Sequence, residues 1–290
     1  MKESKLVLGT VQFGLNYGVA NTAGKPPEAE VCRILETAAE HGIRVLDTAS
    51  GYGDSEAVLG RTLKLTGLDK TMRIVSKVVF PDETPDEEAG VIIRESLMRS
   101  LENLQVDHLH ALIFHREALW KFQHHLQTLC QEGYLSYTGC SIDGTAPEQP
   151  LPAVIQIPSN ILDRRFVSYA EQVHGNGGFV FVRSVYLQGL LVMDEAKIPA
   201  HLQSVIPCRR KLQTLAENNR MTLQEMCMRY LMSFPQFDAI LTGVDNAEQL
   251  KENIALASQP PLPDEVMQEI FRIVPELPES LIRPSTWNRK

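Results

Sequence analysis

The sequence has no apolar run of the length that crosses a membrane, and its first apolar stretch, Leu6–Leu8, is too short for the core of a secretory signal. It also has no cluster of Lys and Arg, and its formal net charge is -8. Nucleic-acid binding depends mainly on grouped cationic side chains that meet phosphates. We therefore expect a cytoplasmic protein whose partners include neither a membrane nor a nucleic acid.

Cysteine is scarce as well. The 290 residues include five cysteines, and no two of them form a CxxC pair. An odd, scattered set is typical of buried thiols in a reducing compartment and argues against a disulfide framework.

The positions of the histidines do not indicate a metal site either. His108 and His115 lie in one strand-like run, where roughly 23 Å would separate them at ~3.3 Å per residue. His124 and His125 are neighbours in a helical segment, so we expect their side chains to point in different directions. We predict no metal site.

Missing too are a Pro/Gly-rich linker and, after the first apolar run, the GxGxxG turn of a dinucleotide-binding sheet. What is present is an alternation of short apolar runs with longer segments of helical periodicity. The short runs predict eight strands, at Leu6–Leu8, Arg44–Leu46, Ile74–Val78, Leu109–Phe114, Thr138–Ser141, Val154–Ile157, Phe179–Val182 and Ala239–Leu241.

Helices are predicted between these strands. Thr84–Glu87 indicates a capping box with proline at the first helical position. Other predicted helices cover residues 31–39, 163–173, 208–218, 222–233 and 245–257. Strands that alternate with helices imply a parallel sheet. Eight such units without a linker favour an α/β fold, a (β/α)8 TIM barrel as a single domain over residues 1–290, over an open Rossmann-like sheet with a small second domain.

Polar side chains follow three neighbouring strands, at the carboxyl end where such a barrel builds its site. Asp47 and Tyr52 follow the second strand, Lys77 lies near the end of the third, and His115 follows the fourth. A carbonyl that accepts hydride needs a proton donor, and a cationic Lys77 should lower the pKa of Tyr52 from ~10 toward the working pH. Asp47 would hold Lys77 charged, and His115 would orient the substrate oxygen. Each residue alone has an ordinary structural explanation, but their joint placement favours chemistry.

Several motifs around these residues resemble those of the aldo-keto reductases. Asp47-Thr48-Ala49, Tyr52-Gly53, Ser55-Glu56 and Leu59-Gly60 resemble the family signature after the second strand, and Leu8–Thr10 with Phe13-Gly14 resembles its first strand. The similarity continues through residues 156–165, 183–191 and 248–253. The resemblance implies an NAD(P)(H)-dependent oxidoreductase that reduces aldehydes or ketones, or oxidises sugar-type alcohols. It further implies a catalytic tetrad of Asp47, Tyr52, Lys77 and His115, with Tyr52 as proton donor.

The same resemblance implies a set of cofactor-binding residues: Ser141, Gln156, Arg183, Ser184, Leu187, Gly243, Gln249 and Asn253. Ser141 and Gln156 would hold the nicotinamide carboxamide. Arg183 takes the place of an aromatic ring, and a planar guanidinium can also stack on the nicotinamide.

Because the aldo-keto reductases favour NADP(H), the resemblance makes NADP(H) the expected cofactor ahead of NAD(H). Relatives that are strict for NADP carry cationic or hydroxyl side chains where this chain has Gly243, Val244 and Gln249. The helix after the eighth strand should still offer backbone amides to a phosphate. We therefore expect the NADPH preference to be small, which leaves NAD open.

Two other functions are left open: a cofactor-free barrel isomerase or lyase, and a cofactor-binding regulatory subunit without turnover. The substrate would be a small-molecule carbonyl or alcohol of unpredicted identity, and no oligomeric state is predicted. The segments 188–207 and 275–290 should shape specificity. In the second of these, Trp287 would belong either to a lid over the site or to an anchor on the outside of the barrel.

Overall fold

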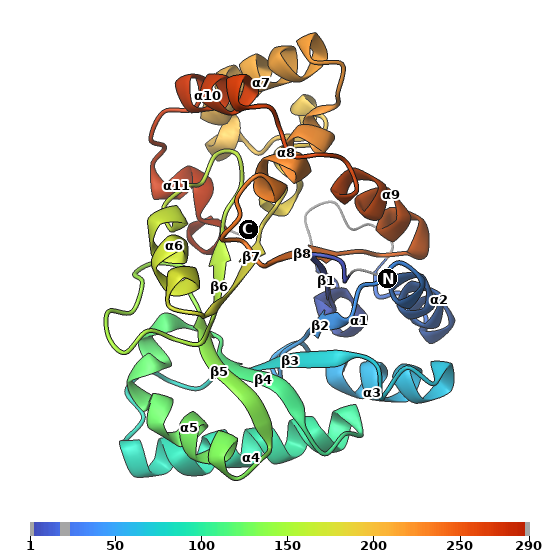
Figure 1. Cartoon of the computed structure of the whole chain (residues 1–290), viewed down its shortest axis with the longest axis vertical. Coiled ribbons are helices and arrows are strands. Elements are labelled where there is room, and N and C mark those ends of the chain that lie inside the picture. The colour runs from blue at the N-terminus through green and yellow to red at the C-terminus, as the bar shows by residue number, and fades with distance from the viewer. Residues whose placement is uncertain (1–2, 18–23, 288–290) are drawn as a thin grey trace.

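The computed structural model describes residues 3–17 and 24–287, and within them eight parallel strands close into a barrel. The strands follow one another around the barrel in chain order, and β8 pairs with β1 to close it (Figure 1). Their bounds are β1 Leu6–Gly9, β2 Val45–Asp47, β3 Arg73–Val78, β4 Leu109–Phe114, β5 Leu135–Ser141, β6 Val154–Pro158, β7 Phe179–Arg183 and β8 Ala239–Gly243. The predicted (β/α)8 barrel is confirmed.

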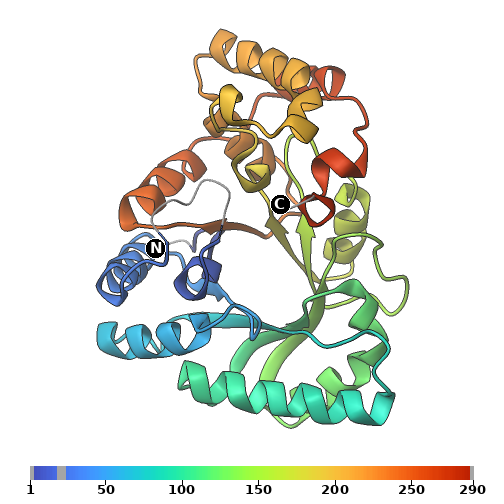
Figure 2. The same ribbon diagram turned by 180° about the vertical axis from the view of Figure 1, so that it is seen from behind.

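Helices form the layer outside the strands, as two opposite views show (Figures 1 and 2). Their bounds are α1 Val11–Gly14, α2 Glu28–Glu40, α3 Ser55–Thr66, α4 Asp86–Leu104, α5 Gln123–Gln131, α6 Val167–Gly175, α7 Ile206–Asn218, α8 Leu223–Met232, α9 Ala247–Ala257, α10 Asp264–Ile273 and α11 Glu279–Ile282. Short 3-10 helices lie at Glu117–Phe122, Leu187–Gly189, Glu195–Lys197, Ala200–Val205 and Pro284–Thr286. Among the described helices, none is both long and apolar enough to span a bilayer.

The alternation of side chains along each strand separates the barrel interior from the helix layer. The main apolar core joins strand and helix residues, whereas a smaller cluster includes Val75 of β3 and Val154 of β6. Two positions further along, on the same faces of these strands, are Lys77 and Gln156. The interior is therefore apolar in its middle and polar at its carboxyl end.

Some helices begin at other residues than predicted, because local hydrogen bonds engage the residues before them. Helix α6 begins at Val167 rather than at residue 163, because Asp163 pairs with Asn160 in an isolated bridge. The predicted capping box is wrong: the Thr84 hydroxyl donates to the Pro81 carbonyl, and the N-cap of α4 makes no side-chain cap bond. Helix α10 and the short helices between residues 187 and 205 are absent from the prediction.

Candidate active site

Three buried side chains from β2, β3 and β6 are joined by hydrogen bonds at the carboxyl end of the barrel. The Lys77 ammonium donates to Asp47 Oδ2 at 2.6 Å and to the Thr48 carbonyl at 2.8 Å. The Gln156 amide donates to Asp47 Oδ1 at 2.8 Å. The side chains of Lys77 and Asp47 are only 1% and 4% exposed. A buried charge is tolerated when it is paired and hydrogen-bonded, and this ion pair meets both conditions.

Tyr52 reaches the ion pair from the loop between β2 and α3. Lys77 Nζ lies 5.0 Å from the centre of the Tyr52 ring. The loop approaches α1 closely because Gly14 has no side chain: a Cβ there would lie 1.8 Å from the Tyr52 carbonyl oxygen. Ser55, the first residue of α3, donates to the Thr10 carbonyl at 2.7 Å. The glycine-containing motifs of the first two loops therefore hold the phenol in place.

The Tyr52 phenol holds its proton more tightly than an ordinary tyrosine. Burial raises the pKa of Tyr52 above 10.0, and the Lys77 ammonium opposes this rise without cancelling it. Lys77 lowers this pKa, as predicted, but desolvation outweighs its charge, so the net shift is upward and not toward the working pH. Burial acts to lower the pKa of Lys77, but Asp47 and Tyr52 raise it overall. At neutral pH, Tyr52 is protonated and Lys77 is charged.

His115 follows β4 and packs edge-on against Tyr52, with the ring centres 5.8 Å apart. Burial, together with the charges of Lys77 and Arg183, lowers the pKa of His115 to about 4. A neutral imidazole has one N–H donor, so His115 can bind a substrate oxygen without bringing a charge. The structure thus brings Asp47, Tyr52, Lys77 and His115 together, and their catalytic roles stay a prediction.

A cavity of about 380 Å³ opens beside these residues, and its lining includes Tyr17, Tyr52 and Arg183. Phe13 of the first-strand motif does not line the cavity and is buried in the main core. Two polar atoms of the described lining residues, Gln12 Oε1 and Thr242 Oγ1, are buried without a hydrogen-bond partner. Buried polar atoms ordinarily have partners, so this cavity is suited to a polar ligand.

Three residues predicted to contact the nicotinamide lie together near the ion pair. Gln156 and Arg183 line the cavity, and Ser141 is buried beside Gln156, its register partner across β5 and β6. One N–H of the Gln156 amide binds the ion pair, which leaves its second N–H to donate to a ligand amide and its oxygen to accept from one. Arg183 donates to the Ile142 carbonyl and to Asp143 Oδ1, each at 3.0 Å. These bonds fix the guanidinium at the edge of the cavity.

The loop after β7 divides the next two predicted residues. Ser184 lines the cavity in a left-handed backbone conformation, with φ of 70°. Leu187 does not line it: this side chain is fully buried in the main core. Its neighbours Tyr186 and Gln188 line the cavity instead. Periodicity offers no guide here, because left-handed residues turn the chain irregularly.

The last three predicted cofactor residues come from β8 and α9. Gly243 and Gln249 line the cavity, and Gln12 packs so closely on Gly243 that a Cβ there would meet its amide nitrogen at 2.5 Å. Asn253 is buried and accepts a hydrogen bond from the Tyr186 hydroxyl at 3.3 Å. Gly243 therefore supplies no cation but makes room for Gln12, which the sequence did not single out.

The first backbone amides of α9 are bound by the chain's own side chains. The Ala247 amide donates to Glu30 Oε1 of α2 at 2.8 Å, and the Gln249 amide donates to Asn246 Oδ1 at 2.9 Å. The Asp245 amide donates to Gln249 Oε1 at 2.8 Å. The bond from Ala247 lowers the pKa of Glu30, so a carboxylate stands at a helix end that favours anions. Two of the first three amides of α9 are therefore occupied by side chains, and the expected binding of a phosphate by this helix end stays a prediction.

The C-terminal tail binds the loop after β5 through Asp143. Arg283 and Ser285 both donate to Asp143 Oδ2, at 2.8 Å and 2.5 Å. Burial acts to raise the pKa of Asp143, but Ser285, Arg283 and Arg183 lower it to about 2. Trp287 packs against the main core, and no described tail residue lines the cavity. These contacts favour the anchor over the lid.

Deleting the residues after Pro284 should therefore lower the melting temperature. The deletion removes Ser285 and the half-buried Trp287, and the lost apolar contact should cost about 1–2 kcal/mol of unfolding free energy. Steady-state KM and kcat should change little, because Arg283 still binds Asp143. Thermal denaturation and steady-state kinetics, measured on the same variant, distinguish the anchor from the lid. Altered KM or kcat at a normal melting temperature would indicate a lid.

Comparison with known proteins agrees with the arrangement described above. A family model described as the aldo/keto reductase family matches residues 5–275. An uncharacterized oxidoreductase of Bacillus subtilis is 23% identical over 262 residues, covering 82% of this chain and 85% of that protein. An NADH-specific methylglyoxal reductase of Escherichia coli is 24% identical over 307 residues, covering 87% and 92%. The holo form of an aldo-keto reductase from Bacillus halodurans has the same fold, with a TM-score of 0.77 at 22% identity and coverage of 96% and 94%.

Proposed function

The chain belongs to the aldo/keto reductase family, a family of oxidoreductases, and on this premise we propose that it moves a hydride between NAD(P)(H) and a small carbonyl or alcohol. The proposed substrates are aldehydes or ketones in reduction and sugar-type alcohols in oxidation. The observation that carries the proposal is the buried ion pair of Lys77 and Asp47 beneath Tyr52. A barrel without proton chemistry has no need of such a pair, whose burial is costly.

Tyr52 is proposed to give its hydroxyl proton to the carbonyl oxygen during reduction. The hydride is the chemistry that a nicotinamide supplies when bound. Lys77 stabilises the phenolate left on Tyr52, since Asp47 keeps the ammonium charged and in place. Neutral His115 donates a hydrogen bond to the same substrate oxygen and orients it. Gln156, Arg183 and Ser184 would hold the nicotinamide end of the cofactor.

Two other functions predict different results. A cofactor-free isomerase or lyase would bind only its substrate in the cavity and no dinucleotide. A regulatory subunit would bind the cofactor but turn over slowly or not at all. Fluorescence titration with NADPH and NADH, followed by an aldehyde and alcohol panel, separates all three. The proposal expects binding and turnover, binding alone supports the regulatory subunit, and no dinucleotide binding supports the isomerase or lyase.

We further propose that the preference for NADPH over NADH is small. A lost charge-assisted contact is worth ~1.5–3 kcal/mol, roughly one to two decades in affinity, and Gly243 and Gln249 supply no such charge. The Glu30 carboxylate at the start of α9 acts in the same direction, since it repels a nearby phosphate, and its pairing with Arg33 reduces this repulsion. A preference of a thousandfold in the titration would contradict this and show that other residues bind the phosphate.

Replacing Glu30 by Gln should raise the affinity for NADPH relative to NADH. The amide keeps an acceptor for the Ala247 amide but removes one negative charge near the helix end. A charge in this position is worth about 0.3–1 kcal/mol, which corresponds to roughly two- to fivefold in the ratio of dissociation constants. Glu36→Gln is the matched control, because it removes the same charge from α2. An equal effect of both variants would mean that Glu30 acts only through net charge.

A further inference from the structure

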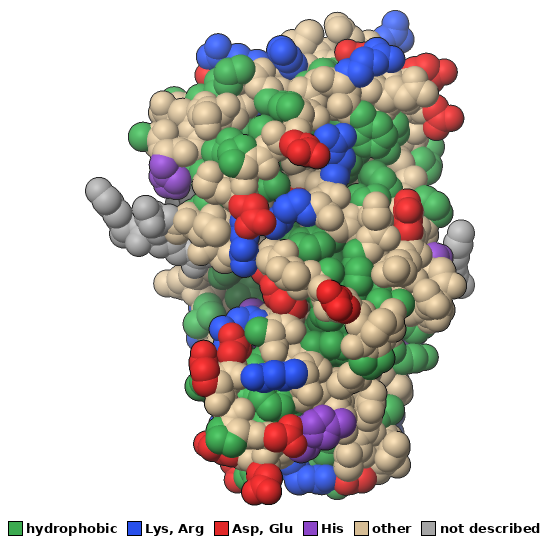
Figure 3. All heavy atoms as spheres, turned by 90° about the vertical axis from the view of Figure 1, so that its left-hand side faces the viewer, with side chains coloured by type: hydrophobic (Ala, Val, Ile, Leu, Met, Phe, Trp, Pro, Cys, Tyr) green, Lys and Arg blue, Asp and Glu red, His purple; other side chains and the backbone are tan. Residues whose placement is uncertain are grey.

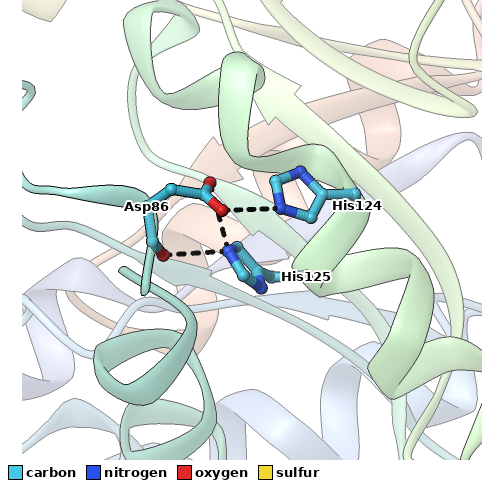
Figure 4. A group of neighbouring side chains, drawn as sticks. All are labelled: Asp86, His124 and His125. Carbon is cyan, nitrogen blue, oxygen red and sulfur yellow. Dashed lines mark hydrogen bonds and ion pairs between the residues drawn. The ribbon is translucent and has the colours of Figure 1, made fainter. Parts of the chain in front are cut away.

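Two adjacent histidines of α5 turn toward one aspartate at the start of α4. Both imidazole rings face the Asp86 carboxylate (Figure 4): His124 Nε2 lies 3.3 Å from Oδ2, and His125 Nε2 lies 3.3 Å from Oδ1. The two ring centres are only 4.0 Å apart. The prediction that these side chains point in different directions is therefore wrong, because both rings swing toward the neighbouring helix.

We propose that Asp86, His124 and His125 form a binding site for one divalent transition-metal ion of the Zn²⁺ type. Their three ligand atoms lie within 4.8 Å of one another. In a tetrahedral site with bonds of about 2.0–2.1 Å, neighbouring ligand atoms are about 3.3–3.4 Å apart. His124 Nε2 has this spacing from Oδ2 and His125 Nε2 has it from Oδ1, so each nitrogen already lies at ligand spacing from one of the two oxygens of the carboxylate. Two imidazoles with one carboxylate suit Zn²⁺, Ni²⁺ or Cu²⁺ better than Mg²⁺ or Ca²⁺.

The helix opposite makes room for one of the rings. Gly90, one turn beyond Asp86 in α4, lies so close to His125 that a Cβ there would be 2.7 Å from the ring carbon Cε1. His125 is only 22% exposed, whereas His124 and Asp86 are 53% and 58% exposed. One ligand is thus held by packing, and the site is open to solvent on its other side. Water could complete the coordination there.

Metal binding through Nε2 of His125 requires the tautomer that carries the ring proton on Nδ1. This Nε2 also lies 3.0 Å from the Asp86 carbonyl oxygen, a contact that needs an N–H on that nitrogen. In the Nδ1–H tautomer the Nε2 lone pair is free for the ion, so a neutral His125 binds without net loss of a proton.

The site joins two neighbouring units of the barrel. Helix α4 follows β3, which carries Lys77, and the segment leading to α5 follows β4, after which His115 stands. In Figure 3 histidine side chains gather beside acidic ones at the lower end of one face, at the level where Figure 1 places α4 and α5. A metal ion there would tie together the outer ends of the two loops that follow Lys77 and His115. The expected consequence is a more stable barrel, not a new reaction.

Titration of the intact protein with Zn²⁺, followed by calorimetry and by melting temperature, tests the proposal. We expect one saturable equivalent and a melting temperature that rises with Zn²⁺ concentration. His124→Gln and His125→Gln should each weaken binding at least about tenfold, since each removes a ligand from an open site. His174→Gln is the matched control, because His174 also contacts a carboxylate, Asp238 Oδ2 at 3.2 Å, and should leave binding unchanged.

Gly90→Ala tests the site without removing a ligand. Alanine is the better helix former, so the variant should fold at least as well as the parent protein. Its Cβ would displace the His125 ring and weaken Zn²⁺ binding several-fold. Absence of a saturable equivalent in the parent protein overturns the proposal. So does full retention of Zn²⁺ by both histidine variants, which would assign the metal to other residues such as the free cysteines.

Discussion

Replacing Tyr52 by Phe should lower kcat for carbonyl reduction by about a hundredfold to ten-thousandfold, the usual contribution of a positioned proton donor. The variant keeps the ring beside His115 and above Lys77, so packing should survive. The dissociation constant of NAD(P)H, measured by fluorescence, should change little, because only the hydroxyl is lost. Substantial turnover by the variant would contradict the assignment of Tyr52 as the proton donor.

Tyr17→Phe is the matched control. Tyr17 lines the same cavity, but its hydroxyl is not among the described hydrogen-bond partners of Asp47 and Lys77, so it should matter far less to kcat. The pH profile gives a second check. Because burial raises the pKa of Tyr52 above 10.0, reduction by the parent protein should slow only as pH rises through that alkaline range, where the phenol loses its proton. The alkaline limb should be missing from any residual activity of Tyr52→Phe.

Replacing Lys77 by Met should destabilise the fold by about 3–5 kcal/mol, as expected when one member of a buried ion pair is removed. Asp47 would keep the hydrogen bond from Gln156 but lose its counter-charge, although its side chain is only 4% exposed to solvent. Activity should also fall sharply, since the phenolate of Tyr52 would lose its cation. Chemical denaturation measures the first effect and steady-state kinetics the second.

The double variant Lys77→Met/Asp47→Leu separates stability from activity. Replacing both charges by apolar side chains should restore most of the lost stability, because no unpaired charge remains. It should restore none of the activity. Lys64→Met, which breaks the exposed pair with Asp69, should leave the free energy of unfolding nearly unchanged. If the double variant is less stable than Lys77→Met, the carboxylate itself stabilises the barrel.

The positions of the strands could be predicted because most strands are short runs of apolar, often β-branched residues. The residues at which the strands begin and end could not be predicted. Strand β6 ends at Pro158, one residue beyond the predicted Val154–Ile157. Strand β5 begins at Leu135, three residues before the predicted start at Thr138, because Ser136 and Tyr137 interrupt the apolar pattern on which the prediction depends. Helix ends depended on local bonds, such as the bridge that holds Asp163 outside α6. Periodicity reports which face of a segment is buried, but not where its last hydrogen bond falls.

The four clustered side chains of the candidate site could be predicted because barrel geometry brings strand ends together. The direction of the Tyr52 pKa could not, since it depends on how completely the folded protein removes the phenol from water. Glu30 reaches the start of α9 across 217 positions of sequence, and no local pattern signals such a contact. The convergence of His124 and His125 likewise depends on the space that Gly90 leaves on a neighbouring helix.

Closure of the barrel has a consequence for how the protein is made. Strand β1, Leu6–Gly9, leaves the ribosome before the other seven strands of the barrel, but one of its two partners, β8, is the last of the strands to be synthesised. Until Ala239–Gly243 emerges, β1 and β7 each present an unpaired edge, and such edges are prone to pair with other chains. Premature termination before residue 243 should therefore yield aggregates rather than a smaller folded protein. Strand β1 must wait for nearly the whole chain to emerge before both of its edges are paired.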